Sequence, residues 1–266
     1  MKRFAKLLTA FAGLVVSGSA FAAGGHALPY SYTADTSNPA SLQRGARDFM
    51  AYCSGCHSMK YLRYNRIGQD LGIPDDVLKS SLMFTSDKPG DMILSAMPAE
   101  ASKAWFGQTP PDLTLETRAR GADWVYSYLR SFYVDAKRPL GVNNLVLPNA
   151  SMPHVLWALQ GWQVKVEEHA EASDHGEGGH ADGGGEHHGV PLKLVQPGSL
   201  TPDQYEKFVG DLVNFMAYAA EPGKSIRTGV GPKAIFYLLI LLTLCYFLKK
   251  EFWRDIHDAP AKDKLP

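Results

Sequence analysis

The sequence predicts a mainly α-helical domain followed by one C-terminal membrane helix. Three patterns lead to this prediction: a capped amphipathic helix at residues 40–52, a second capped helix that starts at Thr201, and an apolar run after residue 230. In the first two, apolar side chains recur at the spacing of one helix face. The 27 basic residues balance the 27 acidic ones, so we predict no nucleic-acid partner.

The N-terminus has the pattern of a secretory signal peptide at residues 1–22. Basic residues precede an apolar run at residues 7–16, and an Ala-x-Ala cleavage site ends at Ala22. The apolar run is too short to cross a bilayer, which argues against a membrane anchor here. We therefore expect cleavage after Ala22 and export of the following domain, residues 23–224, to the periplasm.

The first helix of the exported domain is predicted at residues 40–52. Asn38 offers a capping side chain, and Pro39 suits the first turn of a helix. Gly45 lies in the middle of the helix, where glycine costs about 1 kcal/mol relative to alanine. A glycine at this position suggests that another helix crosses close by.

The crossing partner is predicted late in the chain. Thr201 and Gln204 form a capping box with Pro202 in the first turn. Apolar residues then follow at helical spacing until Glu221 and the Pro-Gly pair after it end the run. We expect this helix to pack against the first.

Shorter elements are predicted between these two helices. Pro74 marks a helix start, and a helix at residues 122–132 would place Trp124, Tyr128 and Phe132 on one face. Residues 162–166 and 190–194 alternate in polarity as two short strands of one β-hairpin.

A His- and Gly-rich segment, residues 167–189, separates the two predicted strands. Its low apolar content predicts a disordered hairpin tip, because it has too little surface to bury. The alternative is capture of zinc, copper or nickel, although no fixed ligand spacing is present. The imidazoles belong to His169, His175, His180, His187 and His188.

The first helix runs into Cys53-x-x-Cys56-His57, the attachment signature of a c-type haem. The two thiols would form thioethers, and the imidazole of His57 would bind the iron as proximal ligand. A thioredoxin-like pair would follow a strand, and a zinc site would have a second ligand pair, so both are disfavoured. The remaining thiol, Cys245, lies in the distant apolar run, so no structural disulfide is expected. We predict a class I cytochrome c-like domain with one covalent haem c.

The C-terminal apolar run predicts a single transmembrane anchor at residues 230–248. As a helix it would be about 28 Å long at ~1.5 Å per residue, close to the roughly 30 Å hydrocarbon thickness. Lys249, Lys250 and Arg254 follow it. With an exported N-terminal domain, these charges place the tail, residues 249–266, on the cytoplasmic side of a bacterial inner membrane.

The sequence resembles the cytochrome c1 family, the haem subunits of cytochrome b–c1 complexes. The haem motif with its continuation to residue 61 is similar to that of the family. The most discriminating piece is Pro-Pro-Asp-Leu at residues 110–113 with the basic residues 118–120, and residues 215–222 resemble the end of the last soluble helix. The resemblance runs from about residue 43 to 253, with a gap over the His-rich segment.

The resemblance implies Met152 as the distal iron ligand. The sequence alone leaves several thioethers open: Met59 is too close to His57 to reach the other iron face, and Met216 fits the apolar stripe of the late helix. His154 is the nearest rival to Met152. The remaining methionines between the haem motif and the Pro-Pro-Asp-Leu stretch are Met83, Met92 and Met97.

The resemblance also implies three residues of the haem pocket. Arg120 would pair with a haem propionate, since a guanidinium fork suits a carboxylate next to an apolar pocket. Pro111 and Trp124 would contribute to the pocket wall.

By this resemblance the chain is an electron carrier that is not catalytic alone. The Rieske iron–sulfur protein would supply its electron, a soluble cytochrome c would accept it, and cytochrome b would hold the anchor in a dimeric complex. No nucleophile–base arrangement is evident in the sequence. Two alternatives are a cytochrome c subunit of a terminal oxidase and a periplasmic metal-handling protein built on the His-rich segment.

Overall fold

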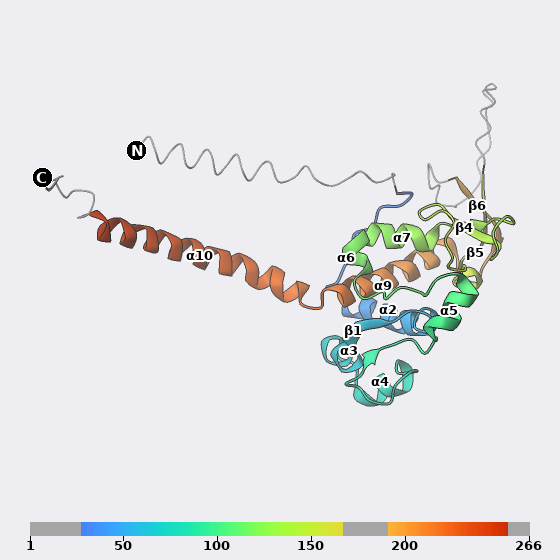
Figure 1. The fold of residues 1–266 in the computed structure, drawn as a ribbon, viewed down its shortest axis with the longest axis horizontal. Coiled ribbons are helices and arrows are strands. Elements are labelled where there is room, and N and C mark those ends of the chain that lie inside the picture. Colours follow the sequence, from blue (N-terminus) through green and yellow to red (C-terminus); the bar gives the residue numbers. More distant parts are fainter. Residues whose placement is uncertain (1–27, 167–190, 255–266) are drawn as a thin grey trace, which may run out of the picture.

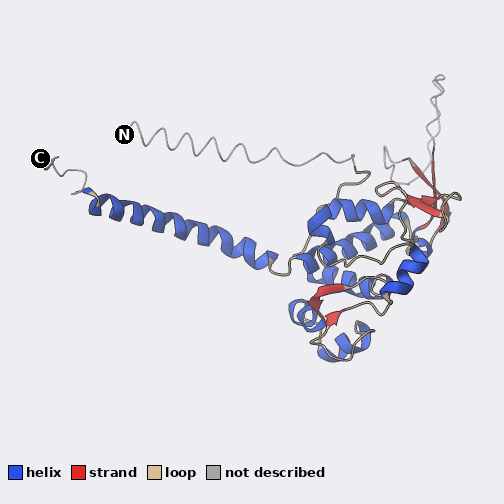
Figure 2. Cartoon of the chain, viewed as in Figure 1, coloured by secondary structure: helices blue, strands red, loops and turns tan. Residues whose placement is uncertain are grey.

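The computed structural model describes residues 28–166 and 191–254. The described part is mainly helical, with short two-stranded sheets at the periphery (Figures 1 and 2). The predicted signal peptide, the His-rich segment and the tail beyond residue 254 lie outside the described residues.

The centre of the domain is the crossing of α2 (Pro39–Tyr52) and α9 (Pro202–Ala220). Gly45 lies at the closest approach: a Cβ there would be 2.1 Å from the carbonyl oxygen of Asp211 and 2.7 Å from the Cβ of Phe215. The predicted close crossing at Gly45 is confirmed, because no side chain larger than hydrogen fits between these backbones.

Both predicted helix starts have the expected caps. The Asn38 side chain accepts a hydrogen bond from the Ser41 N–H at 3.2 Å. At α9 the Gln204 N–H donates to Thr201 Oγ1 at 3.3 Å, and the Thr201 N–H donates to Gln204 Oε1 at 3.0 Å. These bonds satisfy amide groups that have no partner within the helix.

A buried polar network also joins α2 to α9. The carboxylate of Asp211 accepts from Ser41 Oγ at 2.5 Å and from Arg44 Nε at 2.6 Å. Asn214 Nδ2 donates to Ser41 Oγ at 3.0 Å, and the hydroxyl of Tyr32 donates to Asn214 Oδ1 at 2.9 Å. The network holds the lead-in segment and both helices in one register, and no local sequence pattern predicts it.

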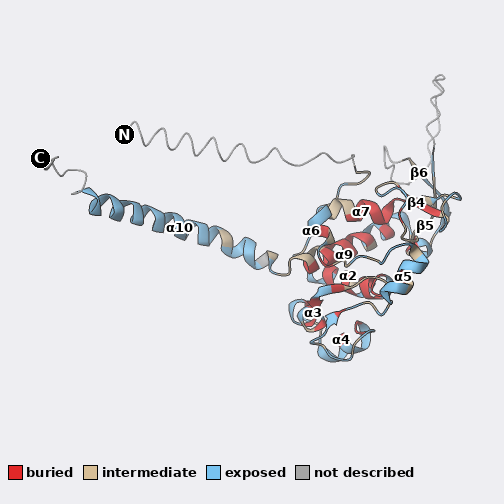
Figure 3. Ribbon diagram, in the orientation of Figure 1, coloured by how far each residue is buried: buried red, intermediate tan, exposed pale blue. Residues whose placement is uncertain are grey.

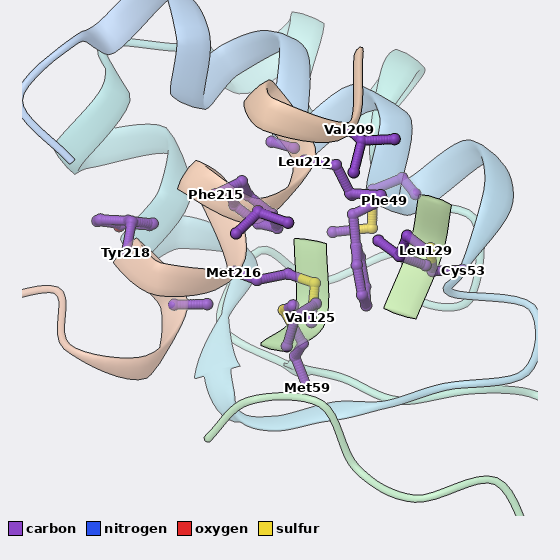
Figure 4. Packing of buried hydrophobic residues seen from close by; sticks show 14 of the residues in the cluster. Phe49, Cys53, Met59, Val125, Leu129, Val209, Leu212, Phe215, Met216 and Tyr218 are labelled. Atoms are coloured by element: carbon purple, nitrogen blue, oxygen red, sulfur yellow. The ribbon is translucent and has the colours of Figure 1, made fainter. Parts of the chain in front are cut away.

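The apolar core lies around this crossing. Figure 4 shows Phe49, Val209, Leu212 and Phe215 packed together, and all four are fully buried. The core extends onto α6 (Glu116–Arg120) and α7 (Ala122–Arg130), both of which contact α9. The domain also contains α3 (Tyr64–Leu71), α4 (Asp75–Ser81), α5 (Ala99–Phe106) and α8 (Trp157–Gln160).

The prediction of one helix over residues 122–132 is wrong at its end. Helix α7 stops at Arg130, and Phe132 opens strand β3 (Phe132–Val134), which pairs antiparallel with β4 (Val142–Asn144). The Ser131 carbonyl accepts from the Leu145 N–H at 3.2 Å, so the backbone there already bonds across to the second strand. Pairing with β4 therefore overrides the helical spacing of Phe132.

Two further strand pairs are present in the described residues. Strand β1 (Met59–Arg63) pairs antiparallel with β2 (Met92–Ile93) directly after the Cys-x-x-Cys-His motif. Strand β5 (Gly161–Lys165) pairs antiparallel with β6 (Leu192–Pro197), close to the two strands expected from the sequence.

Helix α10 (Lys224–Phe252) extends away from the domain and is exposed over nearly its whole length (Figure 3). Its stretch Ile226–Phe252 is the one described helix long and apolar enough to cross a membrane, and none of its apolar window is buried. The helix begins before the predicted span at residues 230–248 and continues through Pro232.

Candidate haem site

The Cys-x-x-Cys-His motif forms a tight turn at the end of α2. Cys53 is the C-cap, with its N–H bonded to the carbonyl of Phe49 at 2.8 Å. The N–H groups of Cys56 and His57 both donate back to the Cys53 carbonyl, at 3.1 and 2.8 Å. Both cysteines and the histidine therefore lie within a single turn of five consecutive residues. Burial raises the pKa of the free Cys53 thiol to about 12, so this sulfur is protonated at neutral pH until the haem is attached.

The imidazole of His57 is oriented by a residue far along the chain. Its Nδ1 lies 2.8 Å from the carbonyl oxygen of Pro111. A carbonyl can only accept, so Nδ1 must carry the proton, and the lone pair of Nε2 is left for a metal. Burial lowers the pKa of His57, which favours the neutral, ligating form of the ring.

The segment that carries Pro111 is tied to the residues after the motif. The Asp112 carboxylate accepts from the Lys60 N–H at 2.7 Å and from Thr114 Oγ1 at 2.7 Å. The Leu113 N–H donates to the Ser58 carbonyl at 2.9 Å. Asp112 was not predicted as a site residue, although it lies inside the Pro-Pro-Asp-Leu stretch, which was the only signal for it.

Arg120 and Trp124, the other two predicted pocket residues, lie against each other. The Arg120 guanidinium is 4.4 Å from the centroid of the Trp124 ring, and its Nε donates to the Glu116 carboxylate. The Trp124 ring stacks on Tyr128 with centroids 5.2 Å apart. The structure thus brings these two residues together, with the Arg120 charge shared between a carboxylate and an aromatic face.

Met152 is half-buried and packs against the hydrophobic core that includes Cys53. It follows Asn149, whose φ of 65° is left-handed and bends the chain just before it. Its role as distal ligand stays a prediction. Among the rival thioethers, Met216 is buried at 3 % exposure and Met59 at 0 %, and both are seen in the core packing of Figure 4.

His154, the nearest rival of Met152, lies in an aromatic cluster. Its ring stacks on Phe132 with centroids 5.0 Å apart and meets the edge of Trp162 at 6.0 Å. It is buried, and its Nε2 has no hydrogen-bond partner in the described part of the chain. Burial lowers the pKa of His154 to about 4, so the ring is neutral at physiological pH.

The donor set fits a covalently held haem. Two thiols flank a tight turn, the adjacent imidazole has its proton fixed on Nδ1 by Pro111, and a half-buried thioether is available at Met152. In the described ranges, no three His, Cys, Asp or Glu side chains gather in the manner of a separate metal site. Fold and site together define a membrane-anchored protein of the c-type cytochrome class.

Comparison with known proteins narrows this class. The family model described as "Cytochrome C1 family" matches residues 29–173 and 193–256, and the chain belongs to the cytochrome c1 family. It is 45% identical over 252 residues to a cytochrome c1 of Allochromatium vinosum, covering 95% of this chain and 99% of that protein. It is also 42% identical over 223 residues to a protein of Nitrosomonas europaea named ammonia monooxygenase gamma subunit, covering 84% of this chain and 86% of that protein.

A solved structure titled "Hyperthermophilic respiratory Complex III" matches with a TM-score of 0.43 and 17% identity, over 95% of this chain and 98% of that one. Membership of the cytochrome c1 family rests on the sequence matches. It confirms the predicted covalent c-type haem and electron transport within the cytochrome b–c1 complex, which contains cytochrome b and the Rieske protein. Cytochromes c1 are membrane-anchored, in agreement with α10. The terminal-oxidase and metal-handling alternatives are not favoured.

Proposed function

We propose that this chain carries single electrons on a haem bound through Cys53 and Cys56, with His57 and Met152 as axial ligands. It takes electrons from the Rieske protein and passes them to a soluble cytochrome c. The observation that carries the proposal is the contact between His57 Nδ1 and the Pro111 carbonyl, which leaves Nε2 as the ligating atom. When bound, the haem supplies a one-electron ferric–ferrous couple.

The protein's part is to set the environment of that couple. The Pro111 carbonyl fixes the ring orientation of His57 and raises its basicity. Met152 would supply a thioether ligand, which favours the ferrous state and would raise the potential. Arg120, held on Trp124 and Glu116, would present its guanidinium to a propionate.

The wider organisation belongs to the same proposal. We assign residues 23–224 to a periplasmic class I cytochrome c-like domain with β5 and β6 as a hairpin insertion, after removal of residues 1–22. Residues 230–248 cross the inner membrane once, and residues 249–266 lie in the cytoplasm, as the basic residues after the span indicate. The complex is dimeric, and electrostatics govern the brief encounters with the soluble acceptor.

Replacement of Met152 by leucine tests the ligand assignment. Leucine keeps the apolar volume and removes the sulfur, while Cys53, Cys56 and His57 remain to hold the haem. The midpoint potential should fall by several steps of about 59 mV, each a tenfold change in the one-electron equilibrium. The weak far-red sulfur-to-iron band of the ferric protein should disappear.

Met97→Leu and Met216→Leu are the matched controls and should keep both the band and the potential. If the band and the potential survive in Met152→Leu, Met152 is not the ligand. The same pair of measurements on His154→Gln would then decide whether the rival imidazole binds the iron.

A further inference from the structure

A cavity of about 330 Å³ lies at the root of the anchor helix, where α9 ends and α10 begins. Figure 1 shows α10 leaving the domain at this point, beside α6. Residues 32–34, helices α6, α7 and α9 and the start of α10 line this junction cavity. Four of its lining residues, Ala34, Ala122, Ala217 and Ala220, have only a methyl side chain, which leaves the space open.

Positive charge predominates at the junction cavity. Arg118 and Lys224 line it, together with one carboxylate, Glu221. That carboxylate is already bound by Arg227, whose Nε and Nη2 donate to it at 2.6 and 3.2 Å. Arg118 Nη1 is 3.9 Å from Glu221, too far for a hydrogen bond, and its side chain is 66% exposed. Three cations therefore surround one anion that is itself taken by Arg227.

The cavity also lies where the lipid-facing surface starts. Ile226 and Val230 are 65% and 56% exposed on the first turns of α10, directly after Lys224. Helical spacing places Lys224 and Arg227 on the same side of α10. A phosphate held in the cavity would have its attached hydrocarbon beside the exposed apolar side chains of this helix.

We propose that the junction cavity binds the headgroup phosphate of an anionic phospholipid whose acyl chains lie along α10. The excess positive charge selects a headgroup with net negative charge, such as that of phosphatidylglycerol, over a zwitterionic one. A carboxylate from a partner protein would also match the positive charge, but it would not account for the exposed apolar surface beside the cavity. The onset of exposed apolar surface next to the cations favours a molecule with one anionic end and a hydrocarbon body.

The test uses the full-chain holoprotein, purified in detergent and depleted of lipid. Binding of phosphatidylglycerol and of phosphatidylcholine is measured by native mass spectrometry for the unmodified chain and for Arg118→Gln/Lys224→Gln. The control, Lys103→Gln/Lys207→Gln, removes the same charge from exposed positions on α5 and α9. The haem absorption spectrum, recorded for every variant, reports whether the domain is folded with its cofactor.

We expect one tightly bound phosphatidylglycerol, weaker phosphatidylcholine binding, and a loss of about thirtyfold in phosphatidylglycerol affinity in the cavity variant alone. Ala220→Leu, which fills the cavity without changing its charge, should weaken binding as well. Equal binding by both double variants would overturn the proposal. So would displacement of the lipid by equimolar inorganic phosphate, which would identify a simple anion site. A cytochrome b carboxylate in the cavity of the isolated complex would equally exclude the lipid.

Discussion

Replacing Gly45 with alanine should destabilise the domain, against the general preference of helices for alanine. In an open helix the change would stabilise by about 1 kcal/mol. In α2 the new Cβ would be 2.1 Å from the carbonyl oxygen of Asp211, a backbone atom that no rotamer change can move. Helices α2 and α9 would have to separate by roughly an ångström, and overpacking of this kind typically costs about 1–3 kcal/mol or more.

Since a backbone contact cannot relax locally, we place the cost of Gly45→Ala at the upper end, with a net loss of about 2 kcal/mol after the helical gain. For a domain of this size that lowers the Tm by about 4–8 °C. The assay is thermal unfolding of the haem-loaded protein followed by circular dichroism. Gly90→Ala is the control, because a Cβ there meets nothing within 4 Å. A Tm for Gly45→Ala equal to or above that of the unmodified chain would refute the close crossing.

Two further changes test the hydrogen bonds that Asp112 makes beside the haem motif and the buried charge of Asp48. Asp112→Ala removes the carboxylate that accepts from the Lys60 N–H and from Thr114 Oγ1, so the free energy of unfolding should fall by about 1–3 kcal/mol. The haem potential should shift as well, because Pro111 is held less firmly against His57. The control Asp87→Ala, on an exposed loop, should leave the stability and the potential unchanged. Burial raises the pKa of Asp48 despite its pairing with Arg47, so charging it opposes folding: stability should fall as pH rises from the usual carboxyl value through the raised pKa. Asp48→Asn should therefore raise the Tm at pH 7 but not at a pH well below 3.8, where the carboxyl is protonated in both the folded and the unfolded state. An equal Tm gain at both pH values would exclude the charge as its cause.

Local patterns made the helices at the centre of the fold predictable. Asn38 and Thr201 are caps that act within one turn, and Gly45 reveals a close neighbour because glycine is costly in a helix without one. The haem motif is predictable too, because its two cysteines and its histidine lie within five consecutive residues. Long-range pairing was not predictable: Phe132 keeps helical spacing with Tyr128, yet it leaves the helix to pair with Asn144.

The long-range contacts that hold the haem site in place were also not predictable from local sequence patterns. Pro111 was expected only as pocket wall, on resemblance, and its carbonyl instead orients His57. Backbone carbonyls carry no sequence signature, so the identity of residue 111 says little about its acceptor role. The Ser41–Asp211 network joins residues 170 apart, which no local spacing can reveal.

The bond between His57 and Pro111 closes a loop of 54 residues, and this separates two stages of biogenesis. The thiols of Cys53 and Cys56 are presented by a single turn, so an unfolded, newly exported chain already offers what covalent attachment requires. Orientation of the imidazole must wait until residues 110–113 reach the motif, and chain-closure entropy opposes that step. Covalent attachment can therefore precede correct axial ligation. A chain delayed in folding would accumulate as a precursor that carries covalent haem but lacks its proper axial ligands.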